Sequence, residues 1–467
     1  MPGGMPARVC RLSHGELMPL LRPALVAFLL TALLTPVCRA ASKRLGWVDH
    51  PDTRKLHRTP VPRAGGIAIL LGYAVPMAFR GEWSILPAVL AAFATGLLDD
   101  LVGLKPRIKI LGQIAAAALA CGAGVEILGT GAWWHVPLTI IWLAGCSNAV
   151  NLIDGLDGLA AGVGIFAAVA AIATEPESPA AAAAAPLLGA LLGFLLYNFS
   201  PASIFMGDCG SNTLGFLLGC LAVMWPGKST SIDRMSAPVV ALAIPILDTA
   251  LAIFRRFIRN EPIFAADRGH IHHRLLARGF APRKVSAVLY AGAGVLASLS
   301  VLLTRATYSR GAVLVAFCLM VWLALRYLRY DEFDCARRVI FGGVLRSALS
   351  ANLAAREFET AIRGARSLEE CWSAFEDHGP RLGLYSARMQ VYGRMFAAPF
   401  REAETVTVCW SLRVPLNGAG FVELEAPFGA APRLVPLTDS LNNVLAPKLE
   451  TFRPLMSVAA AAGRRTQ

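Results

Sequence analysis

Residues 135–160, HVPLTIIWLAGCSNAVNLIDGLDGLA, join a long apolar run to a cluster of amides and carboxylates. The apolar part, 135–150, approaches the length that a helix needs to cross a hydrocarbon core about 30 Å thick. Backbone polar groups inside lipid must bond to one another, so such a run is helical. Asn148, Asn151, Asp154 and Asp157 follow at its end. Polar groups are costly at a membrane edge, which makes these four candidates for function.

Apolar segments of similar length recur through the first two thirds of the chain. The sequence has 467 residues, of which 55% are hydrophobic and 16% charged, and its mean hydropathy is +0.55. This composition excludes a disordered chain and argues against an ordinary soluble enzyme. We predict an all-α polytopic membrane domain over residues 1–330 with about 11 transmembrane helices, near 17–38, 64–80, 84–101, 110–128, 135–150, 158–174, 183–199, 212–226, 236–255, 285–304 and 311–328.

The first segment has a second interpretation. Arg8 and Arg11 precede it and Arg39 follows it, a pattern that a secretory signal peptide shares. Ten further segments follow, so the membrane assignment holds in either case. Seventeen Lys and Arg residues lie in the loops after segments 1, 3 and 9, against five after the even-numbered segments. The positive-inside rule then predicts cytoplasmic odd loops, an external amino terminus and an internal carboxyl tail.

Residues 331–467 differ in character, being more polar and evenly charged. Residues 336–378 favour helix, 405–414 and 420–425 alternate like strands around an Asn-Gly turn, and 437–452 favour a closing helix. We predict a small C-terminal cytoplasmic α+β domain, either a ligand-sensing module or a docking surface. Trp372 and Trp410 are expected in its core, and His378 stands alone.

Charge and cysteine content narrow the choice of partners. The net charge of +13 comes mainly from the apolar part of the chain, which disfavours nucleic-acid binding. Ten cysteines occur without a CxxC pair, which favours buried thiols over disulfides or a zinc site.

Four polar groups fall on the side that the basic loops mark as cytoplasmic. They are Asp99-Asp100, the amides and acids of 148–157, Asp208, and the histidines of 270–273. Carboxylates and amide oxygens suit Mg²⁺, and the basic residues suit phosphates. Together they indicate phosphate chemistry on a lipid at one membrane face. Each group also has a purely structural interpretation. Asp99-Asp100 suits a solvated helix end, and the histidines suit a polar loop. Helix packing would account for Asn148 and Asn151 and for Gly155, Gly158 and Gly162, and an ion pair with Arg255 would account for Asp248.

Five stretches carry a family resemblance, which covers about residues 17–330. They are RKLHRTPVPRAGG (54–66), DDLVGLKPRIKILGQ (99–113), NAVNLIDGLDGLAAG (148–162), NFSPASIFMGDCGSNTLGF (198–216) and DRGHIHHRL (267–275). The chain thus resembles the polyprenyl-phosphate N-acetylhexosamine-1-phosphate transferases, glycosyltransferase family 4. It is most similar to the subgroup that uses UDP-N-acetylglucosamine and undecaprenyl phosphate. His-Ile-His-His replaces the run of three His typical of the phospho-N-acetylmuramoyl-pentapeptide transferases. Cys209 stands where the family often has a small residue, and we expect it to pack.

The resemblance implies a reaction in which lipid phosphate attacks the UDP-sugar and UMP leaves. It implies Mg²⁺, with Mn²⁺ as an alternative, held by Asn151 and Asp208. Asp99 would deprotonate or position the lipid phosphate, or act as a covalent nucleophile, with Asp100 in support and Lys109 on the pyrophosphate. The remaining implied substrate contacts are Asn148, Asp154 and Asp157 for the nucleotide, His270, His272, His273 and Arg274 for sugar or phosphates, and Arg54, Lys55, His57 and Arg63 at the entrance.

The implied partners are a UDP-sugar, undecaprenyl phosphate and membrane lipid, with no nucleic acid and with a homodimer left open. The implied location is the bacterial cytoplasmic membrane. Two alternatives remain: the pentapeptide transferase reaction, and a multi-span transporter of an anionic solute whose acids and histidines relay ions.

Overall fold

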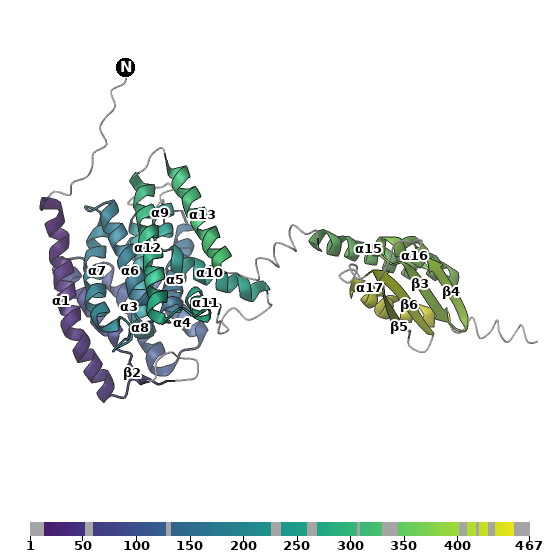
Figure 1. Ribbon diagram of the computed structural model, residues 1–467, viewed down its shortest axis with the longest axis horizontal. Helices are drawn as coiled ribbons and strands as arrows, with labels where there is room; N and C mark the ends of the chain where they lie inside the picture. Colours follow the sequence, from purple (N-terminus) through teal and green to yellow (C-terminus); the bar gives the residue numbers. More distant parts are fainter. Residues whose placement is uncertain are drawn as a thin grey trace, which may run out of the picture. The chain divides into compact units, whose positions relative to one another are not determined.

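The computed structural model divides the chain into two compact units, Met1–Arg329 and Tyr330–Gln467 (Figure 1). Each unit is described by itself. The described residues are 14–51, 59–127, 132–225, 235–258, 269–305, 309–328, 344–400, 409–416, 420–427 and 435–452.

The first unit is a bundle of helices. Every apolar segment expected from the sequence coincides with a helix, although segment 236–255 is broken at Leu242 into two. A short two-stranded ribbon, β1 (Val48–Asp49) and β2 (Val61–Pro62), precedes α2. The helices are α1 (His14–Arg44), α2 (Gly65–Phe79), α3 (Leu86–Val102), α4 (Pro106–Gly122), α5 (His135–Ile153), α6 (Leu159–Thr174), α7 (Pro179–Asn198), α8 (Gly207–Met224), α9 (Ser236–Ala241), α10 (Ala243–Ile258), α11 (Ile271–Ala277), α12 (Pro282–Arg305) and α13 (Arg310–Leu328).

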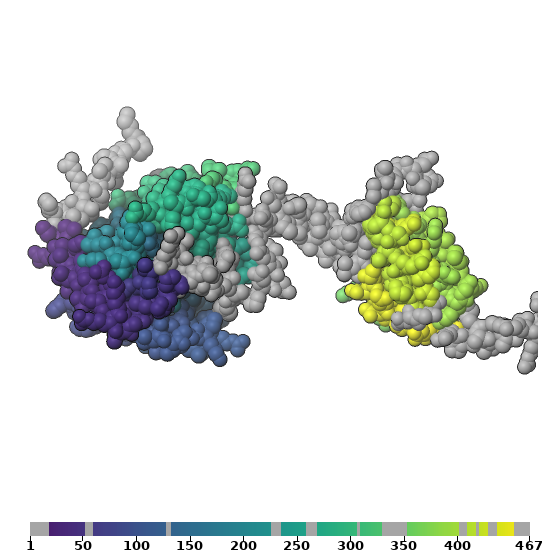
Figure 2. Space-filling view, turned by 60° about the horizontal axis from the view of Figure 1, so that its bottom comes forward, coloured from purple at the N-terminus to yellow at the C-terminus, as the bar shows by residue number. Residues whose placement is uncertain are grey.

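Helix α8 forms the centre of this bundle. Every residue from Cys209 to Val223 is buried, and α8 packs against α3, α5 and α2. A helix that is apolar all round belongs in a core. The outer helices differ, because α1 lies on the surface of the unit (purple in Figure 2) and leaves Leu25 59% and Leu33 70% exposed. Apolar side chains on outer helices are the surface that lipid covers.

Length and apolar composition identify five described helices that are able to cross a membrane: Met18–Arg44, His135–Ile153, Pro179–Asn198, Pro282–Arg305 and Arg310–Leu328.

Small residues let the helices approach closely. A Cβ on Gly162 of α6 would lie 2.0 Å from the ring of Tyr290 on α12, so the prediction of close packing at this glycine is confirmed. The expected buried thiols are found at Cys121, Cys146, Cys209 and Cys220, whereas Cys318, also expected to be buried, is exposed.

The second unit is a four-stranded antiparallel sheet with helices. It contains α15 (Val344–Gly364), α16 (Leu368–Leu382), β3 (Ser386–Val391), β4 (Arg394–Pro399), β5 (Cys409–Pro415), β6 (Gly420–Pro427), α17 (Val435–Ser440), the π-helical turn η4 (Leu441–Leu445) and α18 (Ala446–Glu450). The strand order is β4-β3-β6-β5, with Met389 opposite both Phe396 and Val422. The expected β5–β6 pairing is present, whereas residues 405–408 and 417–419 lie outside the described part.

The hairpin β3–β4 was not expected from the sequence. Its two-residue turn, Tyr392-Gly393, has positive φ at both positions, the geometry that matches strand twist. Met389 and Val391 are buried on the side that faces the core. Trp372 of α16 is 7% exposed and stacks on Phe375 and Phe396, as expected of a core residue. The chain therefore ends in a domain with its own apolar core.

Candidate functional site

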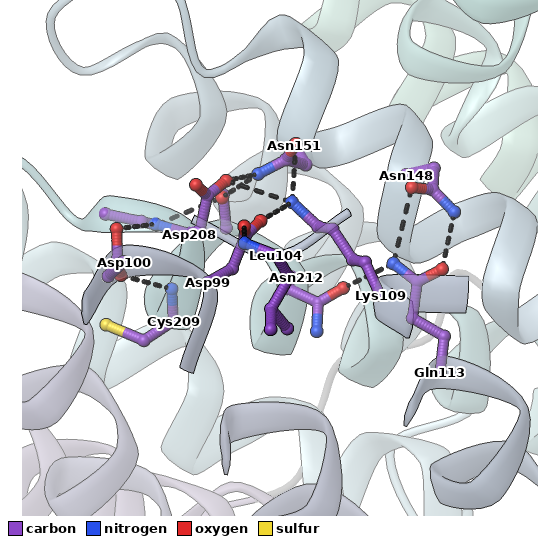
Figure 3. A network of polar contacts seen from close by, with 12 residues as sticks. Asp99, Asp100, Leu104, Lys109, Gln113, Asn148, Asn151, Asp208, Cys209 and Asn212 are labelled. Atoms are coloured by element: carbon purple, nitrogen blue, oxygen red, sulfur yellow. Dashed lines mark hydrogen bonds and ion pairs between the residues drawn. The ribbon is translucent and has the colours of Figure 1, made fainter. Parts of the chain in front are cut away.

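Four helix ends meet at one end of the bundle (Figure 3). Asp99 and Asp100 lie in the last turn of α3, Lys109 in the first turn of α4, Asn151 near the end of α5 and Asp208 at the start of α8. Helices α3 and α5 run toward this end and α4 and α8 start there. Polar residues spread over 110 positions of sequence are thereby brought together.

The Lys109 ammonium is the centre of the cluster. Its Nζ lies 2.6 Å from Asp99 Oδ2, 3.2 Å from Asp208 Oδ1 and 3.4 Å from Asn151 Oδ1. The other oxygen of Asp99 accepts the backbone N–H of Leu104 at 2.8 Å, in the turn between α3 and α4. We call Asp99, Lys109, Asn151 and Asp208 the reactive layer. Three oxygens around one cationic nitrogen make this layer a place for cations.

Asp100 serves the neighbouring backbone. Its carboxylate accepts the N–H groups of Asp208 at 3.0 Å and of Cys209 at 2.8 Å, and its side chain is fully buried. These are donors of the first turn of α8, where negative charge is stabilised by the helix dipole. Gly207 has a φ of +71°, and a Cβ there would lie 2.8 Å from Asp100 Oδ2. Asp100 therefore fixes the start of α8, and with it Asp208.

Arg63 supplies the second cation. Its guanidinium lies 3.2 Å from Asp100 Oδ1, 3.8 Å from Asp208 Oδ2 and 3.6 Å from Asp49 Oδ1. The structure thus ties this predicted phosphate contact to carboxylates. Lys55, with Arg54 and His57, lies outside the described residues.

Amides complete the polar cluster. Asn151 donates to Asp208 Oδ1 and, at 2.8 Å, to Ser211 Oγ. Asn148 pairs with Gln113, which also bonds to Asn212. Sequence reasoning assigned no role to Ser211, Gln113 or Asn212. The signal was available, since Gln113 and Asn212 are amides inside apolar helices.

Asp154 and Asp157 lie in the turn after α5. Asp154 is half-buried at the carboxyl end of α5, and its backbone N–H bonds to Val150 O and Asn151 O. The carboxylate of Asp157 accepts the N–H of Ala202 at 2.9 Å, so it holds a second loop in place. Cys209 packs as expected, fully buried beside Met206.

The histidines gather beside the same turn. His270 Nδ1 lies 2.9 Å from Asp248 Oδ2, and the N–H of Ile271 bonds to Asp248 Oδ1 at 2.8 Å. Asp248 is thus a partner of the histidine motif, a pairing that sequence reasoning missed. His272 contacts the turn, because a Cβ on Gly155 would lie 2.7 Å from His272 Nε2.

Burial sets the protonation state of His272. Its ring stacks on that of His270 and lies tilted against that of His273. Desolvation, followed by the charge of His273, lowers the pKa of His272 to about 4. His272 is therefore neutral near pH 7. Arg274 donates to the carbonyls of Gly269 and Leu328, both at 3.3 Å.

A metal ion would find oxygen ligands in the reactive layer. Among the described residues, no three His, Cys, Asp or Glu side chains are grouped to hold a metal. The mixed set of two carboxylates and one amide oxygen around Lys109 Nζ nevertheless fits a hard cation, because oxygen ligands are what Mg²⁺ prefers. The residues present therefore fit the ion that the resemblance implies.

Comparisons with known proteins identify the family of this chain. Residues 83–226 match the model for glycosyl transferase family 4. The probable undecaprenyl-phosphate N-acetylglucosaminyl 1-phosphate transferase of Bacillus subtilis is 34% identical over 323 residues, which cover 64% of this chain and 89% of the relative. The decaprenyl-phosphate N-acetylglucosaminephosphotransferase of Mycobacterium tuberculosis is 33% identical over 345 residues, 63% of this chain and 85% of the relative. The undecaprenyl-phosphate alpha-N-acetylglucosaminyl 1-phosphate transferase of Escherichia coli K12 is 28% identical over 336 residues, which cover 66% of this chain and 91% of the relative.

The matched model covers α3, α4, α5 and α8, the helices that carry the reactive layer. The expected family is thus confirmed, as are its apolar helices and its transferase class. This chain is a multi-pass membrane protein that belongs to glycosyl transferase family 4.

Proposed function

We propose that this protein transfers N-acetylglucosamine-1-phosphate from UDP-N-acetylglucosamine to undecaprenyl phosphate and releases UMP. The reaction would start a lipid-linked polysaccharide of the cell envelope. The observation that carries the proposal is the Lys109 ammonium, held by oxygens of three other helices at one end of an apolar bundle. The names of the relatives supply the N-acetylglucosamine and the prenyl phosphate.

In this reaction a phosphate oxygen of the lipid attacks the β-phosphorus of the UDP-sugar. The bond from that phosphorus to the UMP oxygen breaks, and the sugar phosphate ends in a pyrophosphate. Both reactants are polyanions, so neutralising and positioning them is most of the catalytic task. Lys109 lies at the centre of the layer and contacts the pyrophosphate in our proposal.

Asp99 binds the lipid phosphate and accepts its proton. One of its oxygens is fixed by Leu104 N–H, so the other is held in one orientation beside Lys109. The second pKa of a phosphate is about 6, so a strong base is not required near pH 7. We therefore favour direct displacement over a covalent intermediate on Asp99.

Asp208 and Asn151 are the proposed Mg²⁺ ligands, and Mn²⁺ would suit the same oxygens. A divalent ion held by these two side chains would offset charge on the diphosphate and on the leaving group. Asp100 takes part by holding the start of α8, on which Asp208 sits.

The surrounding residues form the proposed substrate pocket. Asp154 and Asp157 hold the turn against which the nucleotide binds, and the neutral imidazole of His272 faces that turn. Further contacts to sugar or phosphates come from His270, His273, Arg274, Arg63 and Lys55.

The proposed setting is the bacterial cytoplasmic membrane, crossed by about 11 helices. The excess of basic residues in the odd-numbered loops supports a cytoplasmic position for the reactive layer and the tail, with the amino terminus outside. The homodimer and the ligand-sensing or docking role of residues 331–467 stay hypotheses.

Two competing functions have distinct outcomes. Ion relay in a transporter favours polar groups near the bilayer midplane, whereas this layer lies at helix ends. The pentapeptide transferase reaction differs in its donor. Purified protein is therefore incubated with undecaprenyl phosphate, Mg²⁺ and either UDP-N-acetylglucosamine or UDP-N-acetylmuramoyl-pentapeptide, and UMP is measured. We expect release with the first donor alone and none with EDTA. Release with the second donor alone would overturn the assignment.

A further inference from the structure

A second polar layer lies deeper in the bundle than the reactive layer. Gln113 Nε2 donates to Asn212 Oδ1 at 2.8 Å and to Asn148 Oδ1 at 3.3 Å. Asn148 Nδ2 returns a bond to Gln113 Oε1 at 2.7 Å, and Asn212 Nδ2 donates to Ala92 O at 2.8 Å. We call Gln113, Asn148 and Asn212 the amide tier, visible beside Lys109 in Figure 3.

The tier ties four helices together in one arrangement. It joins α4, α5 and α8 through side chains and α3 through the Ala92 carbonyl. Gln113 is 1% exposed and Asn212 is fully buried. Both N–H groups of the Gln113 amide are used, and an unpaired buried amide costs about 1–3 kcal/mol. Sliding or rotating one helix would therefore break bonds that water cannot replace.

The tier is in register with the reactive layer. Gln113 follows Lys109 by four residues, Asn148 precedes Asn151 by three, and Asn212 follows Asp208 by four. Residues three or four apart share one helix face, at a rise of about 4.5–6 Å. Each reactive side chain on α4, α5 and α8 thus has a tier residue about one turn deeper on the same face.

We propose that the amide tier is a positioning device for the transferase reaction. It sets the rotation and height of α4, α5 and α8 so that Lys109, Asn151 and Asp208 converge. Gln113 is its key residue, since it alone bonds to both other members. None of the three needs to touch substrate, so Asn148 acts here through Asn151 and α5. The inference rests on the proposed function for its kinetic consequence and on geometry for its structural one.

The first test is kinetic. Gln113→Met keeps the length of the side chain and removes all three tier bonds of Gln113. We expect kcat for UMP release to fall about 10- to 100-fold, the cost of a misplacement near 1 Å, with KM for both substrates unchanged. Gln113→Glu keeps the acceptor for Asn148 and loses the donor to Asn212, so it should also lower kcat. It serves as the second variant if Gln113→Met does not fold.

Thr139→Val is the matched control. Thr139 is also fully buried, on α5, where it donates to His135 O at 2.8 Å and accepts from Ile127 N at 3.0 Å. It belongs to neither layer. We expect Thr139→Val to lower the melting temperature as Gln113→Met does, with kcat near wild type. Equal kcat in the Thr139 and Gln113 variants at matched folded fractions would overturn the positioning role.

The second test does not depend on activity. An experimental structure of Gln113→Met, or of Gln113→Glu, is compared with that of the wild type. We expect Lys109 Nζ to move out of bonding distance of Asp208 Oδ1 or Asn151 Oδ1. A reactive layer that superposes on the wild type would refute the inference. If wild-type protein releases no UMP from any nucleotide sugar, the proposed function fails, while this comparison still decides whether the tier positions the layer.

Discussion

Replacing Lys109 with methionine separates the two tasks of its ammonium group. Asp99 Oδ2 and Asp208 Oδ1 lie 2.6 Å and 3.2 Å from the same nitrogen. They are therefore at most about 6 Å apart, where two unit charges repel by about 3 kcal/mol at an effective dielectric of about 20. Without the ammonium, that repulsion is relieved by protonation or by another cation. We expect Lys109→Met to lower kcat at least about 100-fold, as when a fixed charge at the reacting group is lost.

The same variant should bind divalent ions more tightly, because the ammonium no longer competes for the oxygens. Relief of about 3 kcal/mol corresponds to about 100-fold in affinity. Mn²⁺ binding without nucleotide is measured by electron paramagnetic resonance on detergent-purified protein. Lys105→Met is the control, since it removes the same charge from the exposed start of α4. Weaker Mn²⁺ binding in Lys109→Met than in wild type would refute competition for shared oxygens.

Four further outcomes follow from the geometry. Asp100→Asn should lower the free energy of unfolding by about 3 kcal/mol, because one of two buried N–H groups loses its acceptor; thermal unfolding of the variant and the wild type checks this. Between pH 6.5 and 4 the unfolded chain protonates His272 and the folded chain does not, so stability should fall by about 3 kcal/mol as pH drops through that window, and less in His272→Gln. Trp372→Ala should destabilise the second unit by about 3–5 kcal/mol in a thermal scan and leave UMP release intact. Deleting residues 335–467 should likewise preserve UMP release, since the site lies within Met1–Arg329.

The sequence was sufficient to predict the helices and the composition of the site. Apolar length alone locates the helices of the first unit, because lipid allows no other backbone structure there. The motifs around Asp99, Asn151 and Asp208 indicate which side chains meet, since acids and amides within or at the edge of apolar membrane helices are costly. The break at Leu242 in segment 236–255 had a signal in the sequence that our prediction did not use. Pro245 has no N–H to bond to the carbonyl of Ala241, and its ring crowds that carbonyl, so a continuous helix is interrupted there.

The contact partners of individual side chains could not be predicted from the sequence. Asp248 lies seven residues before Arg255, which suggested a pair on one helix, whereas the fold brings His270 to Asp248 from 22 residues away. Arg63, a predicted phosphate contact, also has carboxylate partners, Asp100 and Asp208, that the sequence did not indicate. Local spacing describes one helix face, but these contacts depend on how separate helices pack. The hairpin β3–β4 was not predicted because its turn residues, Tyr392-Gly393, are a weak sequence signal for a turn.

The charges of the site explain why cations and acids are interleaved there. Four carboxylates, those of Asp49, Asp99, Asp100 and Asp208, lie against two cations, Lys109 and Arg63, so this cluster carries about two net negative charges. At a membrane edge, bare carboxylates would repel one another and the polyanionic substrates alike. The two cations hold the acids together, and a divalent ion held by the proposed ligands Asp208 and Asn151 would bring the net charge to about zero. The cluster would then no longer repel a diphosphate and a lipid phosphate. The same arithmetic explains why removing Lys109 should strengthen ion binding while it slows the reaction.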